Sequence, residues 1–110
     1  VTGDDPVAGV DNVKEYIVHT HAKDGVRLHE NDPEYVYGCF AEGDIDAINA
    51  LDGFQELPLG QGDVDFVGYL TALKHIGFSG FLTIERECGD EPAEDIKMAV
   101  EFLKEIIKEI

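Results

Sequence analysis

The sequence predicts an α/β fold with parallel strands, and two observations lead to this prediction. Short apolar runs alternate with segments whose apolar residues recur every three or four positions, so strands should alternate with helices along the chain. Two of the apolar runs, within residues 16–21 and 81–84, give way to His or Glu where a strand would end. Because parallel α/β sheets place ligands at the carboxyl ends of their strands, both ends are candidate site positions.

The first half of the chain is predicted to hold a helix, a strand and a long loop. Residues 6–14 are typical of a short helix, with Asp4 or Asp5 as its cap and a proline in its first turn. The strand at 16–21 follows. From residue 25 to residue 53 the pattern weakens into a polar loop, within which a short stretch around residues 44–51 can form one or two helical turns. A loop of this length in a compact domain is usually functional or mobile.

The next segment predicts a strand followed by a helix. Residues 54–58 are predicted to form a short strand, and Gly60-Gln61-Gly62 is typical of a turn. Asp63 or Asp65 can then cap a helix whose apolar positions are spaced by three or four and which ends at Gly77.

The last segment repeats this order. Residues 81–84 form the third predicted strand, and Asp90 and Glu91 begin a helix with Pro92 in its first turn. The predicted core stripe of this helix consists of Ala93, Ile96, Val100, Leu103, Ile107 and Ile110.

Composition restricts the class of protein. With 110 residues and 44% hydrophobic content, the chain is expected to form one soluble, cytoplasmic domain, and it contains no apolar run long enough to cross a bilayer. Its formal charge of −16 argues against nucleic acid and anionic membrane surfaces as partners. Cys39 and Cys88 lack the spacing of a zinc motif and are predicted to be free thiols.

Three motifs together resemble a known family. They are His19-Thr20-His21-Ala22-Lys23-Asp24, the segment Pro58-Leu59-Gly60-Gln61-Gly62-Asp63-Val64-Asp65-Phe66, and Gly80-Phe81-Leu82-Thr83-Ile84-Glu85-Arg86-Glu87. In this order they resemble the sugar-phosphate isomerase/epimerase family, the xylose-isomerase-like group of TIM barrels. The resemblance implies that residues 1–110 are the C-terminal part of a (β/α)8 TIM barrel, about three βα units with parallel strands, corresponding to strands six to eight.

The resemblance also implies a metal site. Members of the family hold one divalent ion, Mn²⁺ or Mg²⁺ with Zn²⁺ or Co²⁺ as alternatives, between two Glu, one Asp and one His. His21 matches the His ligand, and Glu85 matches a Glu ligand that also serves as catalytic acid or base. The other ligands would belong to strands before this chain, so the chain alone need not hold a metal. Without the resemblance, a His near a strand end is more often a structural residue.

Other residues near the motifs are weaker candidates. Arg27 stands six residues after His21, where epimerases of the family often place a substrate-binding Arg, and His19 is the second candidate for contact with substrate. A structural role is the simpler interpretation of His19. Lys23 and Asp24 either belong to the site or simply pair with neighbours at the barrel mouth. Glu87 is expected at a loop edge.

The resemblance implies a divalent-metal-dependent sugar or sugar-phosphate isomerase or epimerase that transfers a proton through an enediolate. The chain is expected to be inactive alone and to form a homo-oligomer that covers its barrel-facing surface. A non-catalytic, self-associating or partner-binding remnant of such a barrel is the alternative. The metal-dependent endonucleases that cut at abasic sites share the fold, but the strong negative charge argues against DNA as a substrate.

Overall fold

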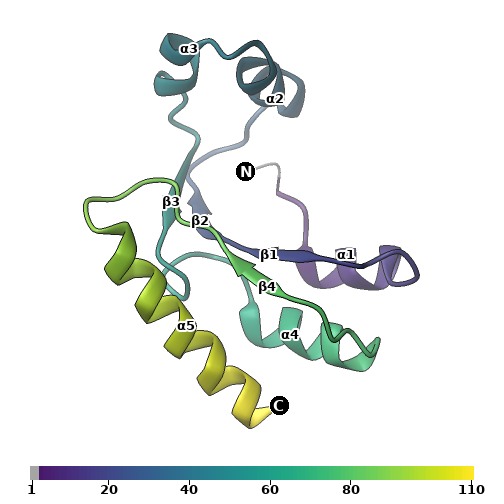
Figure 1. The fold of residues 1–110 in the computed structure, drawn as a ribbon. Helices are drawn as coiled ribbons and strands as arrows, with labels where there is room; N and C mark the ends of the chain where they lie inside the picture. Colours follow the sequence, from purple (N-terminus) through teal and green to yellow (C-terminus); the bar gives the residue numbers. More distant parts are fainter. Residues whose placement is uncertain (1–2) are drawn as a thin grey trace.

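The computed structural model describes residues 3–110 and shows a two-stranded parallel sheet with helices packed against it (Figure 1). The first two residues of the expected domain 1–110 lie outside the described residues. Strand β1 (Thr20–Ala22) pairs with β4 (Leu82–Ile84) in parallel register, with Thr20 opposite Leu82. The predicted α/β class with parallel strands is therefore confirmed.

Three helices pack against this sheet and against one another. They are α1 (Pro6–Val13), α4 (Phe66–His75) and α5 (Pro92–Glu109). Two of the predicted caps are present, since the Asp5 side chain accepts a hydrogen bond from the Val7 N–H and the Asp65 side chain accepts one from the Gly68 N–H. The shared core consists of Val10, Ala22, Leu59, Phe66, Leu70, Leu73, Ala99, Leu103 and Ile106.

A second pair of strands lies beside the parallel sheet and corrects the prediction for residues 54–58. Strand β3 (Phe54–Leu57) does not join the parallel sheet but pairs antiparallel with β2 (Asp24–Arg27). The described residues thus place two strands in the parallel sheet, and β1 and β4 are direct neighbours. The strand predicted at 54–58 is present at Phe54–Leu57, but its pairing direction depends on contacts with a distant segment.

Two helices occupy the tip of the β2–β3 hairpin, where the sequence suggested a mostly irregular loop (Figure 1). Helix α3 (Ile45–Asn49) falls within the helical turns expected there, whereas α2 (Pro33–Glu42) was missed. Its sequence signals are standard ones: Asp32 caps the Glu34 N–H, a proline opens the helix, and Gly43 ends it with φ 65°.

Two other predictions need correction. The strand predicted at 16–21 begins only at Thr20, and Tyr16 and Val18 are exposed, because β4 offers no partner before Leu82. The core stripe of α5 is rotated from the predicted one: Leu103 is buried as expected, but Ile96 and Ile107 are exposed. The buried positions of α5 are Ala99, Leu103 and Ile106.

Two predictions from composition can also be compared with the structure. Cys39 is buried, Cys88 is exposed, and both are free thiols as predicted. None of the helices in residues 3–110 is both long and apolar enough to cross a membrane.

Candidate functional site

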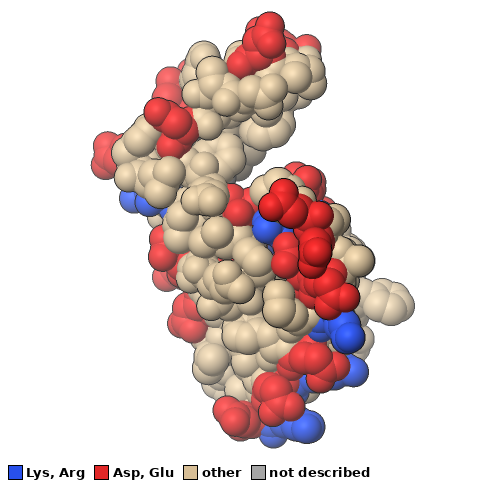
Figure 2. All heavy atoms as spheres, turned by 90° about the vertical axis from the view of Figure 1, so that its left-hand side faces the viewer, with Lys and Arg blue, Asp and Glu red and all other residues tan. Residues whose placement is uncertain are grey.

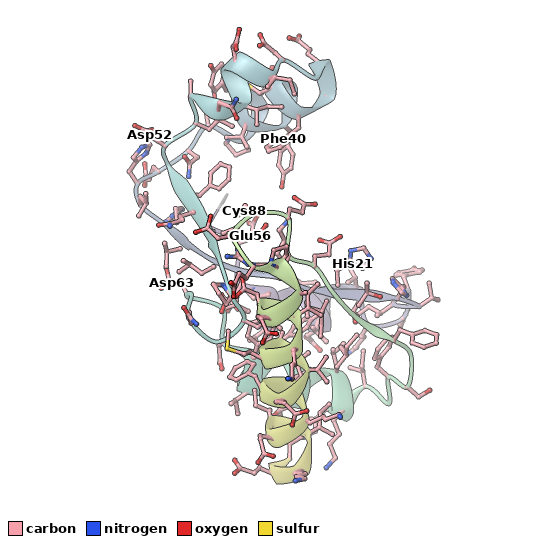
Figure 3. The ribbon with its side chains drawn as sticks, turned by 60° about the vertical axis from the view of Figure 1, so that its left-hand side comes forward. His21, Phe40, Asp52, Glu56, Asp63 and Cys88 are labelled. Carbon is pink, nitrogen blue, oxygen red and sulfur yellow. The ribbon has the colours of Figure 1, made fainter. Side chains whose placement is uncertain are left out.

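The candidate site lies at the carboxyl ends of β1 and β4. Ala22 is opposite Ile84 in the parallel register, and the Glu85 N–H donates to the Ala22 carbonyl at 3.0 Å, which extends the pairing to the strand ends. The side chains that follow these ends therefore come from two neighbouring strands. Figure 3 shows His21 at this edge, with Glu56 and Cys88 nearby from the adjoining segments.

The structure brings His21 and Glu85 into direct contact. His21 Nδ1 lies 2.8 Å from Glu85 Oε1, and the two side chains are 50% and 32% exposed. Both groups are thus reachable from solvent while their relative position is fixed by adjacent strands. This juxtaposition is the one that the strand-end pattern predicted, although their chemical roles remain predictions.

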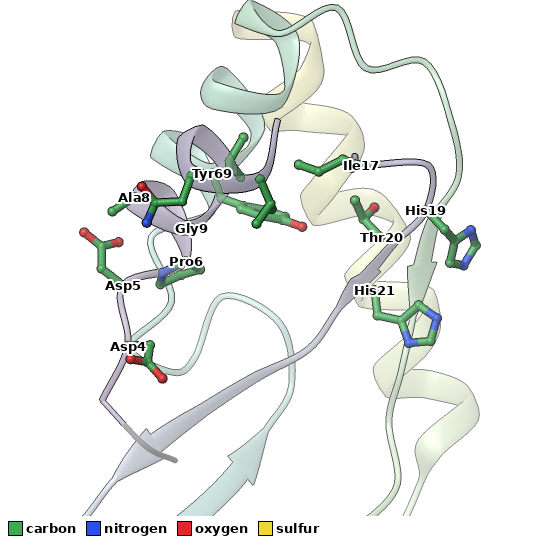
Figure 4. A pocket seen from close by; sticks show the side chains of 13 residues that line it. Asp4, Asp5, Pro6, Ala8, Gly9, Ile17, His19, Thr20, His21 and Tyr69 are labelled. Atoms are coloured by element: carbon green, nitrogen blue, oxygen red, sulfur yellow. The ribbon is translucent and has the colours of Figure 1, made fainter. Parts of the chain in front are cut away.

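His19 lies beside this pair. Its Nε2 is 3.1 Å from the Thr83 hydroxyl, and its ring meets the His21 ring edge to face at a centroid distance of 5.1 Å. Both imidazoles line a cavity of about 660 Å³ between α1 and β1, together with Thr20 and Tyr69 (Figure 4). His19 therefore has a structural partner and also faces space that a ligand can enter.

Arg27 occupies a different place. It lies at the far end of β2 from the strand ends, with its guanidinium against the backbone of Gly3. Among the described residues, it is neither in the lining of the cavity nor in the ion pairs of His21 and Glu85. The structure does not bring the predicted substrate-binding Arg to the site.

Lys23 lies among three carboxylates at the mouth of the sheet. Its Nζ is 2.8 Å from Glu87 Oε2, 3.1 Å from Glu56 Oε2 and 3.9 Å from Glu85 Oε2. Pairing of Lys23 with neighbours, one of the two alternatives predicted for it, is thus what the structure shows. Glu87 is 69% exposed, as expected for a residue at a loop edge.

Glu56 and Arg86 complete this network, and neither role was predicted from the sequence. The Arg86 side chain is 8% exposed and donates from Nη1 to Glu56 Oε1 at 3.0 Å and from Nε to Asp95 Oδ2 at 2.8 Å. It thereby joins β4 to the hairpin and to α5. Arg86 stands next to the candidate Glu85, but its partners lie 30 and 9 residues away, so only the fold reveals them.

The pKa shifts in this network follow from burial and pairing. Burial raises the pKa of Glu56, but hydrogen bonds from the Glu87 N–H, Lys23 and Arg86 outweigh it and leave the pKa below its ordinary value. Burial lowers the pKa of Lys23, but the hydrogen bonds to Glu87 and Glu56 together outweigh this effect. The net shift of the Lys23 pKa is therefore upward. Both groups are therefore held in their charged forms.

Asp24 has a structural role in the turn after β3. Its buried carboxylate accepts backbone N–H bonds from Gly60 and Gly62 at Oδ2 and from Gly25 and Val64 at Oδ1, all between 2.8 and 3.1 Å. The interpretation of Gly60-Gln61-Gly62 as a turn is confirmed. Because these amides already bind Asp24, they are not available to cradle a phosphate.

The acidic surface predicted from composition is visible over much of one face. Figure 2 shows Asp and Glu spread along this face, with Lys and Arg in small separate areas. Such a surface favours cations over phosphate backbones as ligands.

His21 and Glu85 fit part of a metal site. Imidazole nitrogen and carboxylate oxygen are ligands that suit a divalent ion with open positions. The two donor atoms, His21 Nδ1 and Glu85 Oε1, lie 2.8 Å apart at the ends of adjacent strands, so the same ion would be held by both. Within residues 3–110 no third His, Cys, Asp or Glu joins them in a metal-binding group. The chain therefore supplies a ligand pair rather than a complete shell.

The comparisons with known proteins agree with this geometry. Residues 1–106 match the family model described as xylose isomerase-like TIM barrel. No functionally curated protein matches the chain. A solved structure, the xylose isomerase domain protein from Planctomyces limnophilus, has 29% sequence identity and a TM-score of 0.67. The match covers 99% of this chain but 32% of that protein, so this chain spans about a third of its length. The chain belongs to the xylose isomerase-like TIM barrel family.

Proposed function

We propose that this chain is the carboxyl-terminal part of a divalent-metal-dependent sugar isomerase or epimerase. The observation that carries the proposal is the His21–Glu85 contact at the ends of neighbouring parallel strands, in a chain of this family. The chain corresponds to 32% of the solved relative. We therefore propose activity only in a complete barrel, which would provide the remaining ligands. The chain alone is proposed to be inactive, because an incomplete shell does not orient a substrate.

Each residue of the pair has a defined part in this proposal. A bound Mn²⁺ or Mg²⁺ would polarise a sugar carbonyl and its neighbouring hydroxyl, which favours loss of a proton from the carbon between them through an enediolate. Glu85 would move that proton. Its Oε1 faces His21, whereas its Oε2 has Lys23 at 3.9 Å, beyond direct hydrogen-bond distance. Oε2 is therefore the oxygen better placed to accept and return a proton.

Mn²⁺ binding tests the ligand roles. The C2–H resonance of His19 is a suitable reporter, because its ring lies 5.1 Å from the His21 ring and Mn²⁺ broadens nearby signals. We expect titrated Mn²⁺ to broaden the His19 signal of the wild-type chain before that of His75. His21→Ala and Glu85→Ala should each raise the required Mn²⁺ concentration about tenfold or more, since each removes one donor. The matched control is His75→Ala, which should leave the titration unchanged. Unaltered Mn²⁺ response in both site variants would refute the ligand assignment.

We also propose that copies of the chain associate. In the described residues, β1 and β4 each pair on one edge only, and the apolar side chains of Tyr16, Val18 and Phe81 are 79%, 86% and 80% exposed around their amino ends. Unpaired strand edges and exposed apolar groups favour contact with another chain. Light scattering at micromolar concentration should report a mass above that of one chain, and Val18→Ser with Phe81→Ser should lower it. A well-folded monomer in the wild type would contradict this expectation.

A further inference from the structure

The β2–β3 hairpin places the largely shielded carboxylate of Glu56 beside the candidate site, within reach of Lys23. We infer that Glu56 is a positioning residue that holds Lys23 away from Glu85 and so keeps the His21–Glu85 pair open to a divalent cation. The inference rests on the proposed function, and it assigns a role to a residue outside the three motifs.

The distances from Lys23 to the neighbouring carboxylates support this inference. Lys23 Nζ is 3.1 Å from Glu56 Oε2 but 3.9 Å from Glu85 Oε2, although all three groups meet at the mouth of the sheet. The ammonium group therefore lies closer to Glu56 than to the candidate ligand Glu85. A lysine that moved onto Glu85 would offset the negative charge that attracts an incoming cation, so the ammonium group and the cation would compete for the same carboxylate.

Burial explains why Glu56 is suited to this role. Its side chain is 11% exposed, and its Oε1 accepts bonds from Arg86 Nη1 at 3.0 Å and from the Glu87 N–H at 2.8 Å. These bonds fix the carboxylate plane and direct Oε2 toward Lys23. Low exposure also reduces solvent screening of the Lys23–Glu56 attraction.

Glu87 also contacts Lys23, at 2.8 Å, but it is 69% exposed. Ion pairs that are open to solvent are screened and fix side-chain position weakly. Glu87 is therefore expected to contribute less than Glu56 to the position of Lys23.

The variant Glu56→Gln tests the inference in the full chain with Mn²⁺ alone as the probe. It removes the charge that attracts Lys23, so Lys23 should shift onto Glu85 and compete with Mn²⁺. We expect the Mn²⁺ concentration that broadens the His19 signal to rise about fivefold. Adding Lys23→Met to Glu56→Gln removes the competitor and should return the titration to the wild-type value or below.

Asp95→Asn is the matched control for a merely structural effect. It also removes one of the two carboxylate partners of Arg86, but Asp95 makes no ion pair with Lys23 among those the structure describes. Urea unfolding should show a loss of stability in both single variants, whereas only Glu56→Gln should weaken Mn²⁺ binding.

The outcomes separate this inference from the proposed function. If Mn²⁺ broadens the wild-type His19 signal and Glu56→Gln does not change the titration, the positioning role is overturned and the ligand roles stand. Equal weakening in Glu56→Gln and in its double variant with Lys23→Met would also overturn it, because Lys23 would then not be the competitor. If the wild-type chain shows no selective broadening, the His21–Glu85 pair does not bind Mn²⁺ in this chain, and the positioning role of Glu56 is overturned.

Discussion

Arg86→Met is expected to lower the free energy of unfolding by about 3 kcal/mol, because truncating one member of a buried ion-pair network leaves its partners uncompensated. The Arg86 side chain is 8% exposed, and the side chains of its partners Glu56 and Asp95 are 11% and 16% exposed. Without Arg86, Asp95 loses its short contact at 2.8 Å and Glu56 keeps only Lys23 and backbone donors. Met retains most of the side-chain volume, so the measured loss reports mainly the charge. Urea unfolding followed by circular dichroism gives the value.

Lys104→Met is the control for this prediction. Lys104 forms an exposed pair with Glu101 on α5 at 3.9 Å, with 65% and 68% of the two side chains accessible. Removing it should change stability by less than about 0.5 kcal/mol, since exposed pairs contribute little. Similar small losses in both variants would mean that the Arg86 network is screened by solvent and does not fasten the hairpin and α5 to β4.

Asp24→Ala is expected to cost about 3 kcal/mol, because it leaves backbone donors in the turn after β3 without their acceptor. The Asp24 carboxylate, 4% exposed, binds the N–H groups of Gly60, Gly62 and Val64, and it also binds the N–H of Gly25. Charge-assisted bonds of this kind are stronger than neutral ones. The turn also lies against α5, since a Cβ at Gly60 would stand 2.8 Å from Phe102, so the variant should loosen that packing as well.

Asp63→Ala provides the comparison within the same turn. Asp63 is exposed, and its backbone N–H already donates to the Gly25 carbonyl at 2.8 Å, a bond that the substitution keeps. Its loss should stay within about 0.5 kcal/mol. Thermal unfolding of both variants, at the same protein concentration, distinguishes the two positions. Equal midpoints for Asp24→Ala and the wild type would show that water replaces the carboxylate at no net cost.

The helices were predictable where their ends carry local signals. Asp5 and Asp65 cap α1 and α4 as the sequence suggested, and Pro92 lies in the first turn of α5. Helix α2 carries the same kind of signals around Pro33 and was still missed. Pro33, Gly38 and Gly43, together with several acidic residues, favoured a loop there, and α2 contacts only α3 among the described elements.

The candidate site was predictable in part for a related reason. His21 and Glu85 follow apolar runs, and parallel pairing of those runs is enough to bring the two side chains together. Arg27 was proposed from its distance along the chain to His21, but the chain turns into β2 after Lys23, and Arg27 is carried away along the hairpin. Sequence spacing does not measure spatial distance once the backbone leaves the strand.

Local patterns along the chain were therefore enough to predict the α/β class, the family resemblance and the pair His21 and Glu85, because these depend on short motifs and on groups placed at strand ends. Only the tertiary structure decided that residues 54–57 form an antiparallel hairpin with β2 and that Glu56 meets Lys23 and Arg86. Strand register and buried ion pairs join residues that lie about 30 positions apart. Such contacts depend on how the helices and strands pack together, which no local pattern in the chain records.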